Sequence, residues 1–135
     1  MVTTAVAAST ATQRRIAADA GNLAAITRLL AAGAAPDYRS DRSAMSSLML
    51  AAGRPHPEVV LALLAAGANP KLRTSSGFTP LYHAVLETQV ENARLLLEAG
   101  ADLARDRDLL LATAREKGNA EMKSLLEGAE APPVQ

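Results

Sequence analysis

The side chains best suited to acid–base or metal chemistry in this sequence are its two histidines, His56 and His83. They do not form the His-x-x-x-His pair with which a helix binds zinc. The absence of cysteine excludes disulfides, thiolate metal sites and cysteine nucleophiles. There is also no G-x-S-x-G turn and no phosphate-binding glycine loop. These absences argue against an enzyme and against a bound cofactor, and we expect His83 to be partly packed, or to face a groove, rather than to act as a general base.

The composition favours a small helical protein. The chain has 135 residues, room for one compact domain or a short array of repeats. Hydrophobic residues make up 49% but aromatic residues only 2%, so the core must consist of closely packed alanine, leucine, valine and isoleucine. The 14 basic residues balance 14 acidic ones, so the zero net charge gives no general attraction to nucleic acid or to an anionic membrane.

Neither export nor membrane insertion is indicated. The N-terminal residues lack the basic start and the long apolar run of a secretory signal. The longest apolar runs, such as LLAAGAA at 29–35, are far shorter than the roughly 20 residues needed to cross a bilayer. We therefore expect a soluble, cytoplasmic protein.

One sequence phrase recurs along the chain. It reads RLLAAGAAPD from Arg28, ALLAAGANPK from Ala62 and LLLEAGADLA from Leu95. The glycines of the three copies, Gly33, Gly67 and Gly100, are separated by 34 and 33 residues. Such a period predicts an array of repeats in which each unit buries its apolar face against its neighbours.

The third unit predicts a helix pair most clearly. Thr79 is suited to cap a first helix, Pro80 fits its first turn, and Leu81 and Ala84 face inward. That helix is expected to run to about Glu87. A second helix is expected to begin near residue 90 and to stop at residue 100, where glycine adopts a left-handed conformation without strain.

These features resemble those of ankyrin repeats: the 33-residue period, the T-P-L-x-x-A start and the L-L-x-x-G-A end. The resemblance covers residues 12–127 and implies an all-α solenoid of helix-turn-helix pairs with short hairpin fingers. Its four repeats would span about 12–41, 42–74, 75–105 and 106–127, between flexible segments at 1–11 and 128–135. The first and last would be end caps, the first with a polar outer face at Gln13, Arg14 and Arg15. Such a capped solenoid is expected to be a monomer.

The copies depart from the family pattern in three places. Ser46 and Ser47 replace Thr-Pro in the second unit. Pro55 and Pro57 bracket His56, which predicts an unusually stiff turn between the two helices. The last unit is three residues short, and the missing residues fall between 102 and 109, so the last finger should be truncated.

The resemblance also implies a binding surface, because ankyrin repeats bind other proteins through the fingers and the first helices, which form a concave face. Mapped onto this sequence, the candidate contacts are Tyr38, Arg39, Arg42, Ser43 and Met45 on the first finger, Arg73, Ser75, Ser76 and Phe78 on the second, Arg105 and Arg107 on the third, and Arg54, His83, Leu86 and Glu87 on the helical floor. Six arginines against four carboxylates on this face predict a partner with an acidic or mixed-charge patch. Tyrosine and arginine are typical of binding hot spots.

Several functional interpretations stay open at this point. The leading one is a non-catalytic protein-binding module, and a narrower version is an inhibitor or immunity-type protein that occludes an enzyme or a toxin. A designed or consensus-like scaffold and an enzyme with an unrecognised site are the alternatives. Tyr82 stands where the family has a histidine that ties neighbouring loops together, so a structural role is predicted for it.

Overall fold

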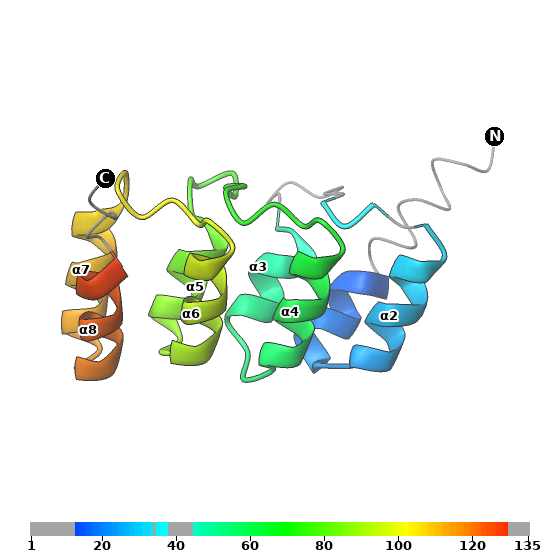
Figure 1. The fold of residues 1–135 in the computed structure, drawn as a ribbon, viewed down its shortest axis with the longest axis horizontal. Coiled ribbons are helices and arrows are strands. Elements are labelled where there is room, and N and C mark those ends of the chain that lie inside the picture. Colours follow the sequence, from blue (N-terminus) through cyan, green and yellow to red (C-terminus); the bar gives the residue numbers. More distant parts are fainter. Residues whose placement is uncertain (1–12, 34, 38–44, 130–135) are drawn as a thin grey trace.

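The computed structural model describes residues 13–33, 35–37 and 45–129 and consists there of helices stacked in a row (Figure 1). A first helix covers residues 13–20, and the others are α2 (Leu23–Ala31), α3 (Ser47–Ala52), α4 (Pro57–Ala65), α5 (Pro80–Leu86), α6 (Val90–Glu98), α7 (Arg107–Glu116) and α8 (Ala120–Ala129). Helices α3, α5 and α7 contact one another in chain order, as do α2, α4, α6 and α8. We call the first helices of the pairs the first row and the second helices the second row. The predicted all-α stack of helix pairs is confirmed.

Two first-row helices, α3 and α5, begin at side-chain caps. Thr79 Oγ1 accepts a hydrogen bond from the backbone N–H of Tyr82 at 3.2 Å, and Pro80 occupies the first turn of α5 as predicted. In the second pair Ser46 does the same work, because its Oγ accepts from the N–H of Met49 at 3.2 Å. The N–H of Ser46 in turn donates to Met49 Sδ at 3.3 Å, so the Ser46–Ser47 replacement keeps a capped helix start.

The second-row helices α2, α4 and α6 are each followed by a left-handed glycine. Gly67 and Gly100 have φ values of 97° and 96°, and nothing lies within 4 Å of where their Cβ atoms would be. Glycine is therefore required at these two positions by backbone conformation and not by crowding. The connection to the next pair starts at each of them.

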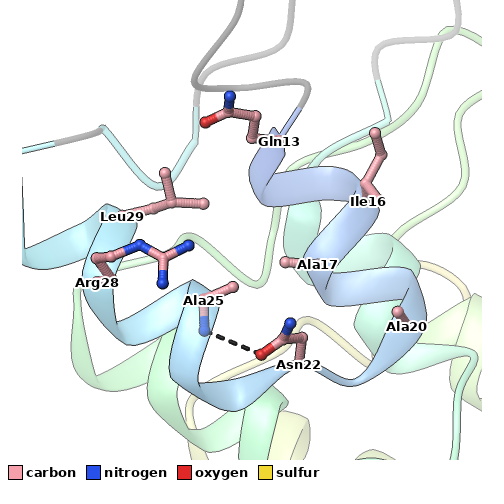
Figure 2. Close-up of a pocket in the computed structure, with 8 residues that line it drawn as sticks. All are labelled: Gln13, Ile16, Ala17, Ala20, Asn22, Ala25, Arg28 and Leu29. Atoms are coloured by element: carbon pink, nitrogen blue, oxygen red, sulfur yellow. Dashed lines mark hydrogen bonds between the residues drawn. The ribbon is translucent and has the colours of Figure 1, made fainter.

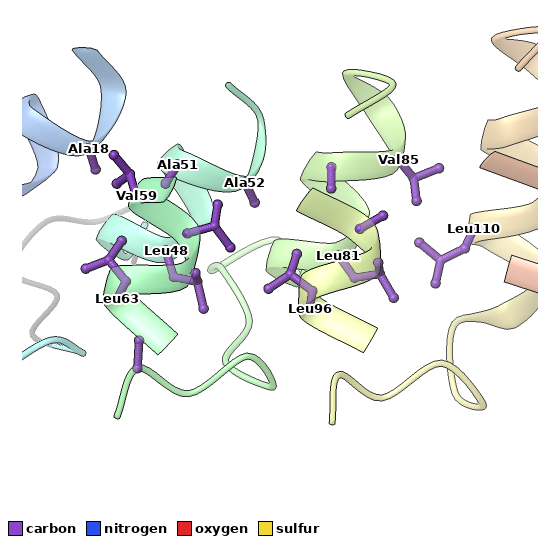
Figure 3. Packing of buried hydrophobic residues seen from close by; sticks show 14 of the residues in the cluster. Ala18, Leu48, Ala51, Ala52, Val59, Leu63, Leu81, Val85, Leu96 and Leu110 are labelled. Carbon is purple, nitrogen blue, oxygen red and sulfur yellow. The ribbon is translucent and has the colours of Figure 1, made fainter. Parts of the chain in front are cut away.

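The core is a continuous band of small and branched side chains between the two rows (Figure 3). In the third pair, one leucine of each helix is fully buried, namely Leu81 in α5 and Leu96 in α6. The leucines at the same place in the second pair, Leu48 and Leu63, are fully buried too. The second and third pairs thus contribute leucines at equivalent positions to a core that no single pair could close.

The last connection is shorter than the one before it. Thr79, the N-cap of α5, follows Gly67 by 12 residues, whereas Asp106, the N-cap of α7, follows Gly100 by only 6. The helix that follows the shorter connection is longer, because α7 has 10 residues and α5 has 7. The truncated last finger is thus accompanied by an early start of the helix that follows it.

The C-terminal end of the row is polar. Val85 and Ala93, which are fully buried in the third pair, have Arg115 and Lys123 as their counterparts 30 residues later, and both of these are exposed. Helix α8 continues to Ala129, so residues 128 and 129 are helical and do not belong to the flexible tail predicted from residue 128. Residues 1–11 and 130–135, the rest of the predicted flexible ends, lie outside the described residues.

The turn inside each pair is built by a left-handed residue, except in the second pair. In three pairs this residue has a positive φ and donates its N–H to a carbonyl three residues earlier, namely Gly21 to Ala18 (3.2 Å), Thr88 to Val85 (3.1 Å) and Gly118 to Arg115 (3.0 Å). Pro55 takes this place in the second pair. Proline has no N–H, and its ring fixes φ near −65°, so neither feature of the turn can form.

Asn92 of the next pair supplies the missing donor. Its side-chain Nδ2 donates to the carbonyl oxygens of Ala52 at 2.9 Å, Ala51 at 3.3 Å and Arg54 at 2.6 Å. Asn92 is 1% exposed, although its counterpart in the second pair, Val59, is apolar and fully buried. A buried amide on α6 therefore closes the end of α3.

The N-terminal end differs from the polar cap that the sequence predicts. Gln13 is exposed as expected, but Arg14 is only 1% exposed and its Nε donates to Ser47 Oγ of α3 at 3.2 Å. Arg14 stands one period before Leu48 and so replaces a core leucine. The apolar residue Ile16 of the same helix is exposed instead, at 65%. The prediction of Arg14 on a polar outer face was wrong because the helix turns this position toward the next pair.

Candidate partner-binding surface

The structure describes most of the predicted contact residues but not those of the first finger. Tyr38, Arg39, Arg42 and Ser43 lie outside the described residues. Along the connections, the exposed candidates are Ser75, Ser76 and Arg105. At the ends of first-row helices, the exposed candidates are Arg54, Glu87 and Arg107. Met45, Arg73, Phe78, His83 and Leu86 are partly buried. The predicted residues thus divide into exposed positions and positions already engaged in packing.

Arg73 braces two connections. Its guanidinium donates to the Asp106 carboxylate at 2.8 and 3.3 Å and to the carbonyl of Gly77 at 2.8 Å. The side chains of Arg73 and Asp106 are only 23% and 16% exposed. A bidentate pair of this kind is strong and directional, so Arg73 holds the second connection to the start of α7.

The ring of Phe78 on the second finger packs on the ring of Tyr82 in α5. Phe78 and Tyr82 stack with centroids 4.3 Å apart and an interplanar angle of 17°. The finger is also closed by its backbone, since Thr74 donates to the Phe78 carbonyl at 2.8 Å and accepts from the Phe78 N–H through Oγ1 at 3.1 Å. Tyr82 ties the finger to α5 through its ring, and Phe78 is part of the same packing. Ser75 and Ser76 form the exposed tip.

A small pocket lies on the first row, between the helix of residues 13–20, α3 and α5. We call it the floor pocket; its volume is about 140 Å³, and it is lined by Asp19, Met45, Met49, Leu50, Gly53, Arg54, His83 and Glu87. Met49 and Leu50 form apolar walls. Three charged side chains, Asp19, Arg54 and Glu87, surround them.

The charges of the floor pocket are only partly balanced. Arg54 Nε donates to Asp19 Oδ1 at 2.7 Å, and both side chains are about half exposed. Glu87 is exposed and makes no ion pair with any residue of the described ranges. Gly53 allows Glu87 to lie against the end of α3, because a Cβ at residue 53 would come within 3.3 Å of Glu87 Cγ.

His83 is held in its neutral form. Burial lowers the pKa of its imidazole, and the Glu87 carboxylate opposes this shift to a smaller extent. Its Nε2 is inaccessible and has no hydrogen-bond partner within the part of the chain that the structure describes. His83 is thus partly packed, as expected, and adds no positive charge to the floor pocket at neutral pH.

This burial predicts acid sensitivity. The unfolded chain binds a proton at His83 near pH 6.5, the ordinary pKa, whereas the folded chain binds it only at lower pH. Above pH 6.5, His83 should therefore not reduce the free energy of unfolding. As the pH falls below 6.5, the free energy of unfolding should decrease. Chemical denaturation between pH 7.5 and 5.5 measures this slope. We expect a smaller slope in His83→Gln, and an equal slope in the two proteins would contradict a buried neutral imidazole.

A second, more apolar groove opens at the N-terminal end of the row (Figure 2). Its volume is about 310 Å³, and its walls include Ile16 and Ala17 of the first helix and Ala25 and Leu29 of α2. Leu29 is partly buried, although its counterpart Leu63 is fully buried beneath a preceding pair. Among the described residues nothing covers this groove, which is equivalent to a surface that the other pairs bury.

Sequence reasoning missed Asp19 as a floor residue. The signal for it was present, since Asp19 stands one period before Gly53, which lines the same pocket. Residues at equal places in successive repeats lie next to each other in the row. A search of all floor positions by period would have included Asp19 beside Arg54.

The described ranges contain no group of three or more His, Cys, Asp or Glu side chains placed to hold a metal ion. Among those same residues, every helix is too short or too polar to cross a membrane.

Comparison with known proteins agrees with the helix pairs and the left-handed glycines. A family model described as ankyrin repeats in three copies matches residues 15–107. The chain therefore belongs to the ankyrin repeat family, whose members generally mediate protein–protein interactions. It is 33% identical over 109 residues to the potassium channel AKT2/3 of Arabidopsis thaliana. That match covers 79% of this chain but only 14% of the channel.

Proposed function

We propose that this chain is a non-catalytic protein-binding module whose contact surface is the first-row floor together with the exposed tips of the connections. The observation that supports it most is the floor pocket, where the exposed carboxylate of Glu87, which has no ion-pair partner within the described ranges, borders apolar walls. By contrast, Arg73 and Asp106 form an ion pair with each other, and little of either side chain is exposed to a ligand.

The partner surface should carry charges of both signs. The predicted arginine excess is reduced on the described part, because Arg54 and Arg73 each pair with a carboxylate of this chain. Glu87 then presents a negative charge at the turn end of α5, whereas Arg105 and Arg107 are exposed at the last connection and the start of α7. Charge complementarity of this kind selects partners and speeds association more than it adds affinity. We propose further that the chain acts as a monomer in the cytoplasm and does not bind nucleic acid.

Charge reversal at Glu87 tests the proposal. Immobilised protein is used to capture partners from an extract of the source cells, and the bound proteins are identified by mass spectrometry. Glu87→Lys should lose at least five-fold in the capture of the partner bound by the wild-type protein. Glu98→Lys is the matched control, because Glu98 is also exposed at a helix end but lies in the second row. Equal capture by Glu87→Lys and Glu98→Lys would overturn the first-row surface.

A further inference from the structure

The floor pocket has the chemistry of a receptor for one long, cationic side chain. Its apolar walls include Met49, which is 1% exposed and fixed by the Ser46 N–H on its sulfur. Leu50 and Met45, both partly buried, extend this apolar lining. A flexible but unbranched stem would find thioether and alkyl groups to lie against, which suits adaptable packing.

The charge at the rim of the pocket favours a cation. Arg54 and Asp19 offset each other at 2.7 Å, and His83 is neutral, so Glu87 leaves the pocket with one net negative charge. Its carboxylate can accept hydrogen bonds from an ammonium group, and Asp19 Oδ2 is a second acceptor on the same rim. An anionic ligand would meet Glu87 without compensation.

The size of the pocket is comparable to that of a lysine side chain. A volume of about 140 Å³ corresponds to about four or five water molecules at ~30 Å³ each. Lysine has five non-hydrogen side-chain atoms, and arginine has seven. We infer that the floor pocket binds a lysine side chain of the protein partner, with its stem on Met45 and Leu50 and its ammonium group at Glu87. This inference rests on the proposed function and names the partner chemistry at that surface.

Methyl NMR provides a direct test without the partner. The chain has four methionines, of which Met45 and Met49 line the pocket and Met122 is fully buried in α8 as an internal reference. Protein labelled at the methionine methyl groups is titrated with Nα-acetyl-lysine methylamide. The signals of Met45 and Met49 should shift saturably, with a Kd in the millimolar range expected for one side chain, while Met122 stays unchanged.

Three further ligands define the recognised chemistry. The norleucine analogue has the same unbranched stem without the ammonium group, the arginine analogue has a larger cationic head, and the glutamate analogue reverses the charge. Each should bind at least five-fold more weakly than lysine. Equal binding of the norleucine analogue would show that the site recognises only an apolar stem, and tighter binding of the glutamate analogue would assign recognition to Arg54. Either result would overturn the inference, and so would tighter binding of the arginine analogue.

Two variants with opposite expected effects make the test specific. Glu87→Gln should weaken lysine binding at least five-fold, and Glu98→Gln should leave it unchanged. Arg54→Gln removes a cation from the rim and frees the Asp19 carboxylate, so it should strengthen lysine binding. If Glu87→Gln binds lysine like the wild type, the pocket does not recognise the ammonium group and the inference fails. If partner capture depends on Glu87 but the lysine analogue does not shift the methionine methyl signals, this inference is wrong and the proposed function is still supported.

Discussion

Asn92→Val is expected to lower the free energy of unfolding by about 1 to 3 kcal/mol, the range for leaving a buried polar group without its partner. The Asn92 amide is the donor that reaches the Ala52 carbonyl, at 2.9 Å, and it also reaches Ala51 and Arg54. Valine is well suited to this position in shape, since Val59 stands there in the second pair. The loss would therefore come from the unpaired carbonyl and not from a cavity. Urea denaturation followed by circular dichroism measures it.

Restoring the backbone donor should compensate for the substitution. Pro55→Gly returns an N–H and a residue free to adopt a left-handed conformation, as at Gly21 and Gly118. In that background Asn92→Val should be less harmful by at least about 1 kcal/mol, the coupling expected for two groups that serve the same carbonyl. Strictly additive effects of Pro55→Gly and Asn92→Val would show that the amide does not replace the proline N–H.

Leu96→Ala is expected to lower the free energy of unfolding by about 2 to 5 kcal/mol, the usual effect of truncating a buried leucine. Leu96 is 0% exposed and belongs to the core cluster that runs through the pairs (Figure 3). Pairs in such a row depend on contacts with their neighbours, and a cavity in the middle of the row weakens more than one unit. Thermal and urea unfolding at constant pH measure the change.

Leu61→Ala is the matched control for Leu96→Ala. Leu61 lies in the second row like Leu96 but is 56% exposed, so its truncation removes little buried area and should change stability by less than about 0.5 kcal/mol. If Leu96→Ala changed stability no more than Leu61→Ala, the repeat register that places Leu96 in the core would be wrong.

The fold could be predicted because its signals are local and repeated. Thr79 and Pro80 mark a helix start, Gly67 and Gly100 mark helix ends, and the spacing of the glycines gives the size of one unit. Packing of identical units then follows from the need of each pair to cover its apolar face. The truncated last connection was equally visible as a gap in the period.

The predictions that failed or were incomplete concern polar side chains whose partners lie in the next pair. Arg14 was assigned to the polar outer face that an end cap needs, yet it donates to Ser47, the residue before its counterpart Leu48 in the next pair. Arg73 was treated as a free contact, although Asp106, which braces it, stands one period away with the opposite charge. Side chains at one repeat position stack on each other, so opposite or hydrogen-bonding groups spaced by the period carry a signal that single-unit reasoning does not use.

Asn92 carried no comparable signal. Its acceptors lie 38 to 41 residues earlier, more than one period away, and they are backbone carbonyls whose exposure depends on the turn at Pro55. The proline could be read from the sequence as a stiff turn, but the donor that compensates for it required the geometry of α3 against α6. Compensation between a backbone defect and a distant side chain emerges only once the pairs are stacked.

The different ends of the row have a consequence for engineering longer arrays. At the N-terminal groove, a copied helix pair placed ahead of Gln13 would meet Ala17, Ala25 and Leu29, side chains of the kinds that are buried between the existing pairs. A pair added after Ala129 would have to cover Lys123, a charged residue at a position that is alanine in the third pair. This scaffold is thus ready for extension in one direction, whereas extension in the other direction first requires redesign of its charged end.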